Sequence, residues 1–229
     1  MTSHPQLIVA LDTDSMDEAN QLVSRLGDTV SWYKVGKQLF TRCGPAAVTS
    51  LKEKGKKVFL DLKFHDIPNT VAQAVRSAAS LGADMTNIHA GGGPAMMRAA
   101  AEAACDCDMI LIAVTVLTSM DADELRKVGV KASPEEQVLR LAKLAQQEGI
   151  RGVVCSGHEI APIRQTCGTD FLLVVPGIRP ADSQHGDQKR VMTPSKAARA
   201  GADYIVVGRP IRAAANPAAA AQSVQDELR

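Results

Sequence analysis

The run MILIAVTV, Met109–Val116, is apolar at nearly every position and rich in β-branched residues. A strand with one face in solvent alternates apolar and polar residues, whereas a strand of a parallel sheet is covered on both faces and shows no such alternation. The run therefore predicts a strand buried on both faces, in a sheet that helices cover.

Seven further short apolar segments share this character, and longer amphipathic segments separate them. Together with the run above, the predicted strands are Gln6–Leu11, Trp32–Val35, Lys57–Leu62, Met85–His89, Met109–Val116, Gly152–Cys155, Phe171–Val175 and Tyr204–Val207. The predicted helices are Met16–Leu26, Leu39–Glu53, Thr70–Leu81, Pro94–Ala104, Pro134–Gln147, Glu159–Thr166, Pro194–Ala200 and Pro217–Leu228. Four of them begin with proline, whose fixed φ suits the first helical position.

Strands that alternate with helices pair in parallel through crossover connections. Eight such units in 229 residues predict a single closed (β/α)₈ barrel, a TIM barrel, that spans residues 1–229 as one catalytic domain. An open doubly wound sheet is the alternative. Against it, Gly91-Gly92-Gly93 follows the fourth predicted strand rather than the first and lacks the G-x-G-x-x-G spacing.

The composition argues against nucleic-acid binding, membrane insertion and a disulfide-stabilised fold. The formal net charge is +1, so no overall positive field attracts nucleic acid. No apolar run approaches the length of a membrane span, and Met1–Gln6 has no signal-peptide pattern. Five scattered cysteines favour a reducing cytoplasm over a disulfide framework. Cys105-x-Cys107 has no second Cys or His pair nearby, so we expect no metal there.

The active site of a (β/α)₈ barrel lies at the C-terminal ends of its strands. Polar residues gather at these positions, while the predicted strand bodies are apolar. In chain order they are Asp12, Lys34, Asp61 with Lys63, His89, Thr118, Ser156, Arg179 and Arg209. A metal site at His89 would need further ligands, so packing or loop support is the favoured role.

The segment DLKFHDIPNT, Asp61–Thr70, is the most informative of these strand ends. Alternate strand residues share a face, so Asp61 and Lys63 point together into the barrel mouth. Asp66 breaks the alternation and belongs to a loop, which Ile67-Pro68 directs outward. An isolated D-x-K can be a structural ion pair, but Asp12 and Lys34 end neighbouring strands, which favours a functional array. His65 has the same parity and is a rival base, although packing is favoured.

The motif D-x-K-x-x-D formed by Asp61, Lys63 and Asp66 resembles that of the bacterial-type orotidine 5′-phosphate decarboxylase family. The resemblance covers essentially the whole chain. It is carried also by Ala10-Leu11-Asp12, Lys34-Val35-Gly36, Leu117-Thr118-Ser119, Pro176-Gly177-Ile178-Arg179-Pro180 and Val207-Gly208-Arg209-Pro210. Relatives that act on sugar phosphates share the motif, whereas its continuation Asp-Ile-Pro-Asn-Thr is typical of the orotidylate enzyme.

The resemblance implies a carboxy-lyase that converts orotidine 5′-phosphate to uridine 5′-phosphate and CO₂, the last step of de novo pyrimidine nucleotide synthesis. It implies no metal and no organic cofactor. Lys63 would stabilise and protonate a ring carbanion, flanked by Asp61 and Asp66, with Lys34 extending an alternating array.

The resemblance also implies a binding set. Asp12 and Lys34 would contact the ribose, Thr118 the pyrimidine edge, and Arg179, Gln188, Gly208 and Arg209 the phosphate. Gln188 falls in the long polar stretch Arg179–Arg190, which we expect to act as a closing lid. The family's homodimer would share its sites, because Asp66, Ile67 and Thr70 would serve the partner.

Three other functions stay open. A magnesium-dependent sugar-phosphate decarboxylase or formaldehyde-fixing synthase of the same superfamily would continue differently after Asp66. A Schiff-base aldolase using Lys34 or Lys63 would need a depressed lysine pKa, which flanking aspartates oppose. A non-catalytic phosphate-binding barrel would explain Gly208 and Arg209 but not the buried Asp–Lys array.

Overall fold

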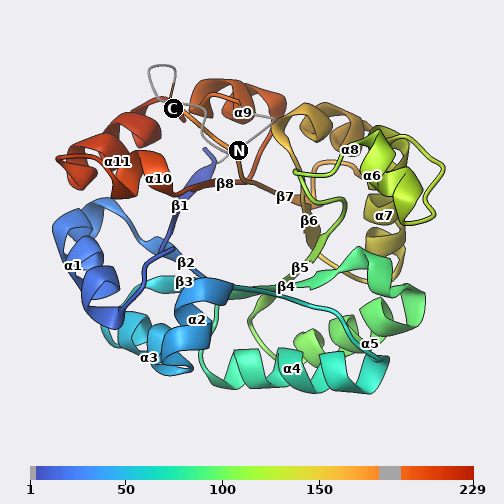
Figure 1. The fold of residues 1–229 in the computed structure, drawn as a ribbon, viewed down its shortest axis with the longest axis horizontal. Coiled ribbons are helices and arrows are strands. Elements are labelled where there is room, and N and C mark those ends of the chain that lie inside the picture. The colour runs from blue at the N-terminus through green and yellow to red at the C-terminus, as the bar shows by residue number, and fades with distance from the viewer. Residues whose placement is uncertain (1–3, 181–191) are drawn as a thin grey trace.

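The computed structural model describes residues 4–180 and 192–229, and eight parallel strands in it close into one barrel in the order β1 to β8 (Figure 1). The strands are β1 Gln6–Ala10, β2 Trp32–Gly36, β3 Lys57–Phe64, β4 Met85–His89, β5 Ile110–Val114, β6 Gly152–Val154, β7 Leu172–Val175 and β8 Tyr204–Val207. The ring closes where β1 pairs with β8. The predicted (β/α)₈ barrel is confirmed.

Helices surround the barrel on its outside (Figure 1). They are α1 Met16–Leu26, α2 Lys37–Cys43, α3 Ala46–Glu53, α4 Pro68–Ser80, α5 Pro94–Cys105, α6 Ala122–Lys127, α7 Pro134–Gln147, α8 Ile160–Cys167, α9 Pro194–Ala200, α10 Arg209–Arg212 and α11 Pro217–Asp226. Short 3₁₀ turns lie at Gly27–Thr29, Ala90–Gly92 and Gly157–Glu159. Within the described chain, no helix combines the length and apolarity needed to cross a membrane.

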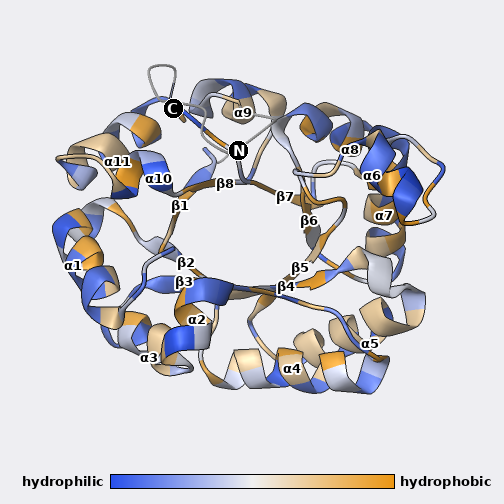
Figure 2. Cartoon of the chain, in the orientation of Figure 1, coloured by the Kyte–Doolittle hydropathy of each residue, from blue (hydrophilic) through white to orange (hydrophobic). Residues whose placement is uncertain are grey.

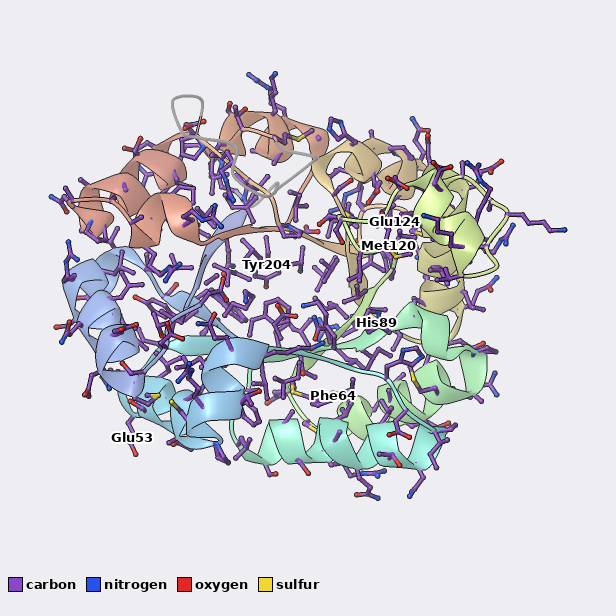
Figure 3. All side chains as sticks on the ribbon, viewed as in Figure 1. Glu53, Phe64, His89, Met120, Glu124 and Tyr204 are labelled. Carbon is purple, nitrogen blue, oxygen red and sulfur yellow. The ribbon has the colours of Figure 1, made fainter. Side chains whose placement is uncertain are left out.

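The strands separate two apolar layers. One layer fills the barrel interior and includes Ile8, Trp32, Phe59 and Ile112, whereas the larger layer packs between strands and helices. Figure 2 shows hydrophobic residues along the strands, and Figure 3 shows Tyr204 inside the ring and Glu53 on the outer rim. The predicted two-sided burial of Met109–Val116 is confirmed, because every residue of this run is buried or nearly so.

The segment Leu39–Glu53 was expected to be one continuous helix, and this prediction was wrong. The structure has two helices, α2 and α3, with Gly44-Pro45 between them. Gly44 has φ +59° and its N–H donates to the carbonyl oxygen of Phe40 at 2.7 Å, which ends α2 in the left-handed region that favours glycine. The short helices α6 and α10 were not predicted.

Candidate active site

Four charged side chains form an alternating chain at the C-terminal mouth of the barrel. Asp12 follows β1, Lys34 lies in β2, and Asp61 and Lys63 lie in β3. Lys34 Nζ lies 3.0 Å from Asp12 Oδ1 and 3.4 Å from Asp61 Oδ2, and Lys63 Nζ lies 2.5 Å from Asp61 Oδ1. The predicted convergence of Asp12, Lys34, Asp61 and Lys63 is therefore present.

Gly36 makes room for one of these ion pairs. A side chain at this position would place its Cβ 2.8 Å from Lys34 Nζ and 3.3 Å from Asp12 Oδ1. Any larger residue would therefore collide with the Lys34–Asp12 pair. This steric requirement gives a physical reason for glycine in the sequence Lys34-Val35-Gly36.

The charges in this array stabilise one another. Burial alone raises the pKa of Asp61, but the ammonium groups of Lys34 and Lys63 outweigh it and hold that pKa below its ordinary value. Burial likewise lowers the pKa of Lys34, but the carboxylates of Asp61 and Asp12 outweigh it and raise that pKa above its ordinary value. Asp61 and Lys34 are therefore charged at neutral pH, and Lys34 lacks the depressed pKa that a Schiff-base lysine needs.

Asn87 also contacts the array, and the sequence analysis missed it. Asn87 lies in β4, is fully buried, and its Nδ2 donates to Asp61 Oδ1 at 2.7 Å. The backbone N–H of Lys63 donates to Asn87 Oδ1 at 2.8 Å. The available signal was an amide side chain in the middle of the predicted strand Met85–His89.

An apolar cavity of about 180 Å³ adjoins Asp61 and Lys63. Its remaining walls come mostly from the later strands and the loops after them. They are formed by Phe59, Val114, Val116, Leu117, Thr118, Val154, Val174, Pro176 and Val206. The cavity is suited to a flat ring with a polar edge, and Thr118 offers a hydroxyl at its wall.

A second, polar cavity of about 510 Å³ lies beside the first and shares Lys34, Pro176 and Val206 with it. Gly208, Arg209, Arg179 and Arg212 line it, together with Asp12, Asp14 and Gln38. Arginine side chains suit a phosphate group, and barrels commonly hold phosphate at the loops after β7 and β8. Asp14, Gln38 and Arg212 were not among the site residues predicted from the sequence.

The loop after β3 stands away from the array. Asp66, Ile67 and Thr70 are exposed, and the side chain of Asp66 accepts from the N–H of Ile67 at 2.7 Å. Ile67 is 67% exposed, to the same extent as Val128. Gln188 and most of the predicted lid lie outside the described residues.

Two histidines meet at the edge of the mouth. The rings of His65 and His89 lie 5.5 Å apart between centroids. Burial, together with the nearby His65 and Lys63, lowers the pKa of His89 to about 4, so His89 is neutral at neutral pH. Within residues 4–180 and 192–229, no three His, Cys, Asp or Glu side chains gather closely enough to hold a metal.

The fold and the site define a class: a (β/α)₈ barrel with a buried Asp–Lys array at its C-terminal mouth and an arginine-lined pocket beside β8. Within that class, the chain belongs to the orotidine 5′-phosphate decarboxylase / HUMPS family, whose sequence model matches residues 5–224.

Similar proteins cover the whole chain. The orotidine 5′-phosphate decarboxylase of Idiomarina loihiensis is 54% identical over 96% of both chains. That of Moorella thermoacetica is 50% identical over 100% of this chain and 94% of its own. The crystal structure of orotidine 5′-phosphate decarboxylase from Lactobacillus acidophilus superposes with a TM-score of 0.89 at 40% identity, covering 99% of this chain and 100% of that one.

Proposed function

We propose that this chain decarboxylates orotidine 5′-phosphate to uridine 5′-phosphate and CO₂, the last step of de novo pyrimidine nucleotide synthesis. Residues 1–229 act as one catalytic domain. The observation that carries the proposal is the buried array of Lys34, Asp61 and Lys63 at the wall of an apolar cavity. Family membership and relatives about half identical along their full length support it.

The chemistry needs a fixed cation beside a developing carbanion. When the bond from the ring carbon to the carboxylate breaks, the electron pair stays on the ring carbon and CO₂ leaves. Lys63 stabilises that charge and transfers a proton from Nζ to the ring carbon. Preorganised charge of this kind lowers the barrier without reorganisation during the reaction. The Lys63 ammonium supplies the positive charge, so the proposal includes no metal and no organic cofactor.

The aspartates and Lys34 support Lys63. Asp61 holds the Lys63 ammonium in place and lies near the substrate carboxylate, whose loss relieves a repulsion. Lys34 neutralises Asp61 from the other side, which permits both charges to stay buried. Asp66 completes the alternating array from the neighbouring subunit.

The substrate spans both cavities. The pyrimidine enters the apolar cavity beside Thr118, and Asp12 and Lys34 bind the ribose where the two cavities meet. The phosphate binds in the polar cavity to the Gly208 amide and to Arg209 and Arg179. Gln188 reaches the same phosphate from a closing lid, and holding the phosphate stabilises the closed form.

The working unit is a homodimer that shares its active sites. Each chain sends Asp66, Ile67 and Thr70 into its partner's site, and all three residues are exposed in the single chain, as this exchange requires. The exchange is reciprocal because a two-fold dimer repeats every contact. The protein works on a small molecule in the cytoplasm, away from nucleic acid and membrane. The five cysteines, all within the described residues, are free thiols, as in a reducing compartment.

A complementation experiment tests the shared site. Chains carrying Lys63→Ala are mixed with chains carrying Asp66→Asn under conditions where subunit exchange is verified. Each parent dimer is nearly inactive, whereas one of the two sites in a mixed dimer receives intact Lys63 and intact Asp66. We expect the mixture to exceed both parents clearly. Demonstrated exchange without returning activity would mean that Asp66 acts within its own chain.

The reaction itself is tested by following the loss of orotidylate absorbance with a strong chelator present. We expect full turnover by the wild-type chain and uridine 5′-phosphate as the product. Activity that the chelator abolishes and magnesium restores would contradict the metal-free reaction. Absence of turnover in any buffer would reject the proposed function.

A further inference from the structure

The β3–β4 pairing is interrupted beside the charged array. Leu60 pairs with Thr86 and Phe64 pairs with Ile88, so the three residues Asp61, Leu62 and Lys63 stand opposite Asn87 alone. Such a bulge leaves backbone groups without their ladder partners and redirects side chains, and bulges often occur next to active sites. Here the bulge contains Asp61 and Lys63, the two residues that β3 contributes to the charged array.

The side chain of Asn87 spans this interruption. Its Oδ1 accepts from the Lys63 backbone N–H at 2.8 Å, and its Nδ2 donates to Asp61 Oδ1 at 2.7 Å. A backbone N–H can only donate and a carboxylate can only accept, so the two contacts fix the orientation of the amide. One fully buried side chain thus connects the backbone of the bulge to the carboxylate between the two lysines.

The backbone of Lys63 needs such support. Lys63 has φ +55°, and it is the single non-glycine residue with a positive φ in the described chain. This conformation is costly for a residue with a long side chain and persists only where surrounding contacts impose it. The hydrogen bond from Lys63 N–H to Asn87 is a contact of this kind.

We propose that Asn87 is a positioning residue for the reaction: it holds the β3 bulge so that Lys63 and Asp61 meet the substrate in reactive geometry. Asn87 itself lines neither cavity, and it acts through Asp61 and Lys63, which line the apolar one. The inference rests on the proposed function for its kinetic consequence, but the hydrogen bonds it depends on can be measured without the reaction.

Thr86 provides a matched control. It is the neighbouring residue of β4, fully buried, and its Oγ1 donates to the Leu60 carbonyl oxygen at 2.9 Å. Thr86→Val removes one buried hydrogen bond from the same strand without touching the charged array. Any effect of lost β4 stability alone appears equally in this variant.

Asn87→Ala removes both contacts. We expect kcat to fall about 10²-fold, as for a small misplacement of a reacting group, while the Kd of uridine 5′-phosphate changes little. We also expect the Lys63 amide to exchange its hydrogen faster than in the wild-type chain. Thr86→Val should keep kcat and the exchange rate at Lys63 close to their wild-type values.

Asn87→Asp separates positioning from simple loss of packing. An ionised carboxylate at this position repels Asp61, whereas a protonated one donates to Asp61 and still accepts from Lys63 N–H. The charged groups facing this position are Asp61 and Lys63 from β3 and Lys34 from β2. The β5 neighbour Ile112 is apolar, and His89 follows in β4. We therefore expect the ratio of variant to wild-type kcat to rise as the pH falls.

The outcomes are distinct. Turnover of Asn87→Ala near the wild-type value, or a loss that Thr86→Val reproduces, would overturn the inference. So would an Asn87→Asp ratio that stays equally low at every pH. If the wild-type chain itself shows no turnover, the proposed function fails. The exchange rate at Lys63 then decides the positioning claim, and unchanged exchange in Asn87→Ala overturns it.

Discussion

The two halves of the barrel mouth differ in chemistry. Strands β1 to β4 and the residues that follow them contribute the polar side, which consists of Asp12, Lys34, Asp61, Lys63 and Asn87. Strands β5 to β8 contribute the apolar side, which includes Val114, Val154, Val174 and Val206. The halves differ in residue type, and the charged half also contains the β3 bulge that holds Asp61 and Lys63.

This difference explains how the site can be strongly charged and still bind a flat ring. Buried charges cost free energy unless they are paired, and Asp61 is paired with a lysine on each side. The valine wall excludes water from the facing side, which strengthens every electrostatic interaction within the cavity. In the proposed function, the charged half therefore carries the reaction, and the apolar half provides the dry surface and leads to the arginine-lined pocket.

The largest expected effect is on the charged half. Lys63→Ala should reduce kcat by about 10²–10³-fold or more, because it removes a charge that acts mainly on the transition state. Binding of uridine 5′-phosphate should remain measurable by calorimetry, since the phosphate and ribose contacts persist. A variant with near-normal kcat would show that Lys63 does not stabilise the transition state. The charged half would then be no more important for turnover than the apolar half.

The polar pocket beside β8 should matter only for a substrate that carries the phosphate. Arg209→Ala should lower kcat/KM for orotidine 5′-phosphate about 10–100-fold, the range for a lost hydrogen bond to a charged group. Gln188→Ala should act in the same direction. Both variants should leave the slow reaction of orotidine without its phosphate unchanged. Equal fractional losses on the two substrates would contradict the phosphate assignment.

In the apolar half, a polar substitution should reduce kcat/KM only where the side chain faces the cavity. Val174→Thr keeps the side-chain shape but adds a hydroxyl to the cavity wall, so we expect kcat/KM to fall about 5-fold, equivalent to about 1 kcal/mol. Val175→Thr is the matched control, because Val175 is buried on the helix side of the same strand. If both variants lose kcat/KM equally, the wall has no specific part in binding.

A smaller effect, on stability and not on turnover, is expected at His89, where the two halves of the barrel mouth meet. His89, at the end of β4, has its pKa lowered from 6.5 to about 4, so the folded chain resists its protonation while the unfolded chain does not. Stability should therefore fall as the pH drops from about 6.5 toward 4. In His89→Gln, the free energy of unfolding, measured with urea at several pH values, should decrease less over this pH range. In His158→Gln, at an exposed position, it should decrease as much as in the wild-type chain. Identical curves for the two variants would contradict the assignment.

Much of this organisation could be predicted from local sequence. Strand bodies such as Met109–Val116 are apolar on both faces, and polar residues begin where the strands end. Because the C-terminal ends of parallel strands meet at one mouth, Asp12, Lys34, Asp61 and Lys63 could be brought together without coordinates. The break at Gly44-Pro45 and the capping box of Asp121 and Glu124 that begins α6 also had local signals, which helical periodicity obscured.

The bulge could not be predicted in the same way. It depends on Asn87, which lies 24 residues from Lys63 and contacts it only after β3 and β4 pair. Strand parity predicted His65 on the face of Lys63, but that argument assumes a regular strand, which the bulge interrupts. The contact of the exposed His65 with the ring of His89 could not be predicted from parity. The role proposed for the exposed residues Asp66, Ile67 and Thr70 depends on contacts with a second chain, which strand patterns within one chain do not predict.

The proposed reaction depends most on the ammonium group of Lys63. Lys63→Cys should be nearly inactive, and alkylation with 2-bromoethylamine places an ammonium at almost the original distance from the backbone. Wild-type and Lys63→Ala chains treated in parallel control for the five natural cysteines. We predict that turnover of orotidine 5′-phosphate returns in alkylated Lys63→Cys and not in treated Lys63→Ala. Fully alkylated Lys63→Cys that remains as inactive as Lys63→Ala would contradict the central claim.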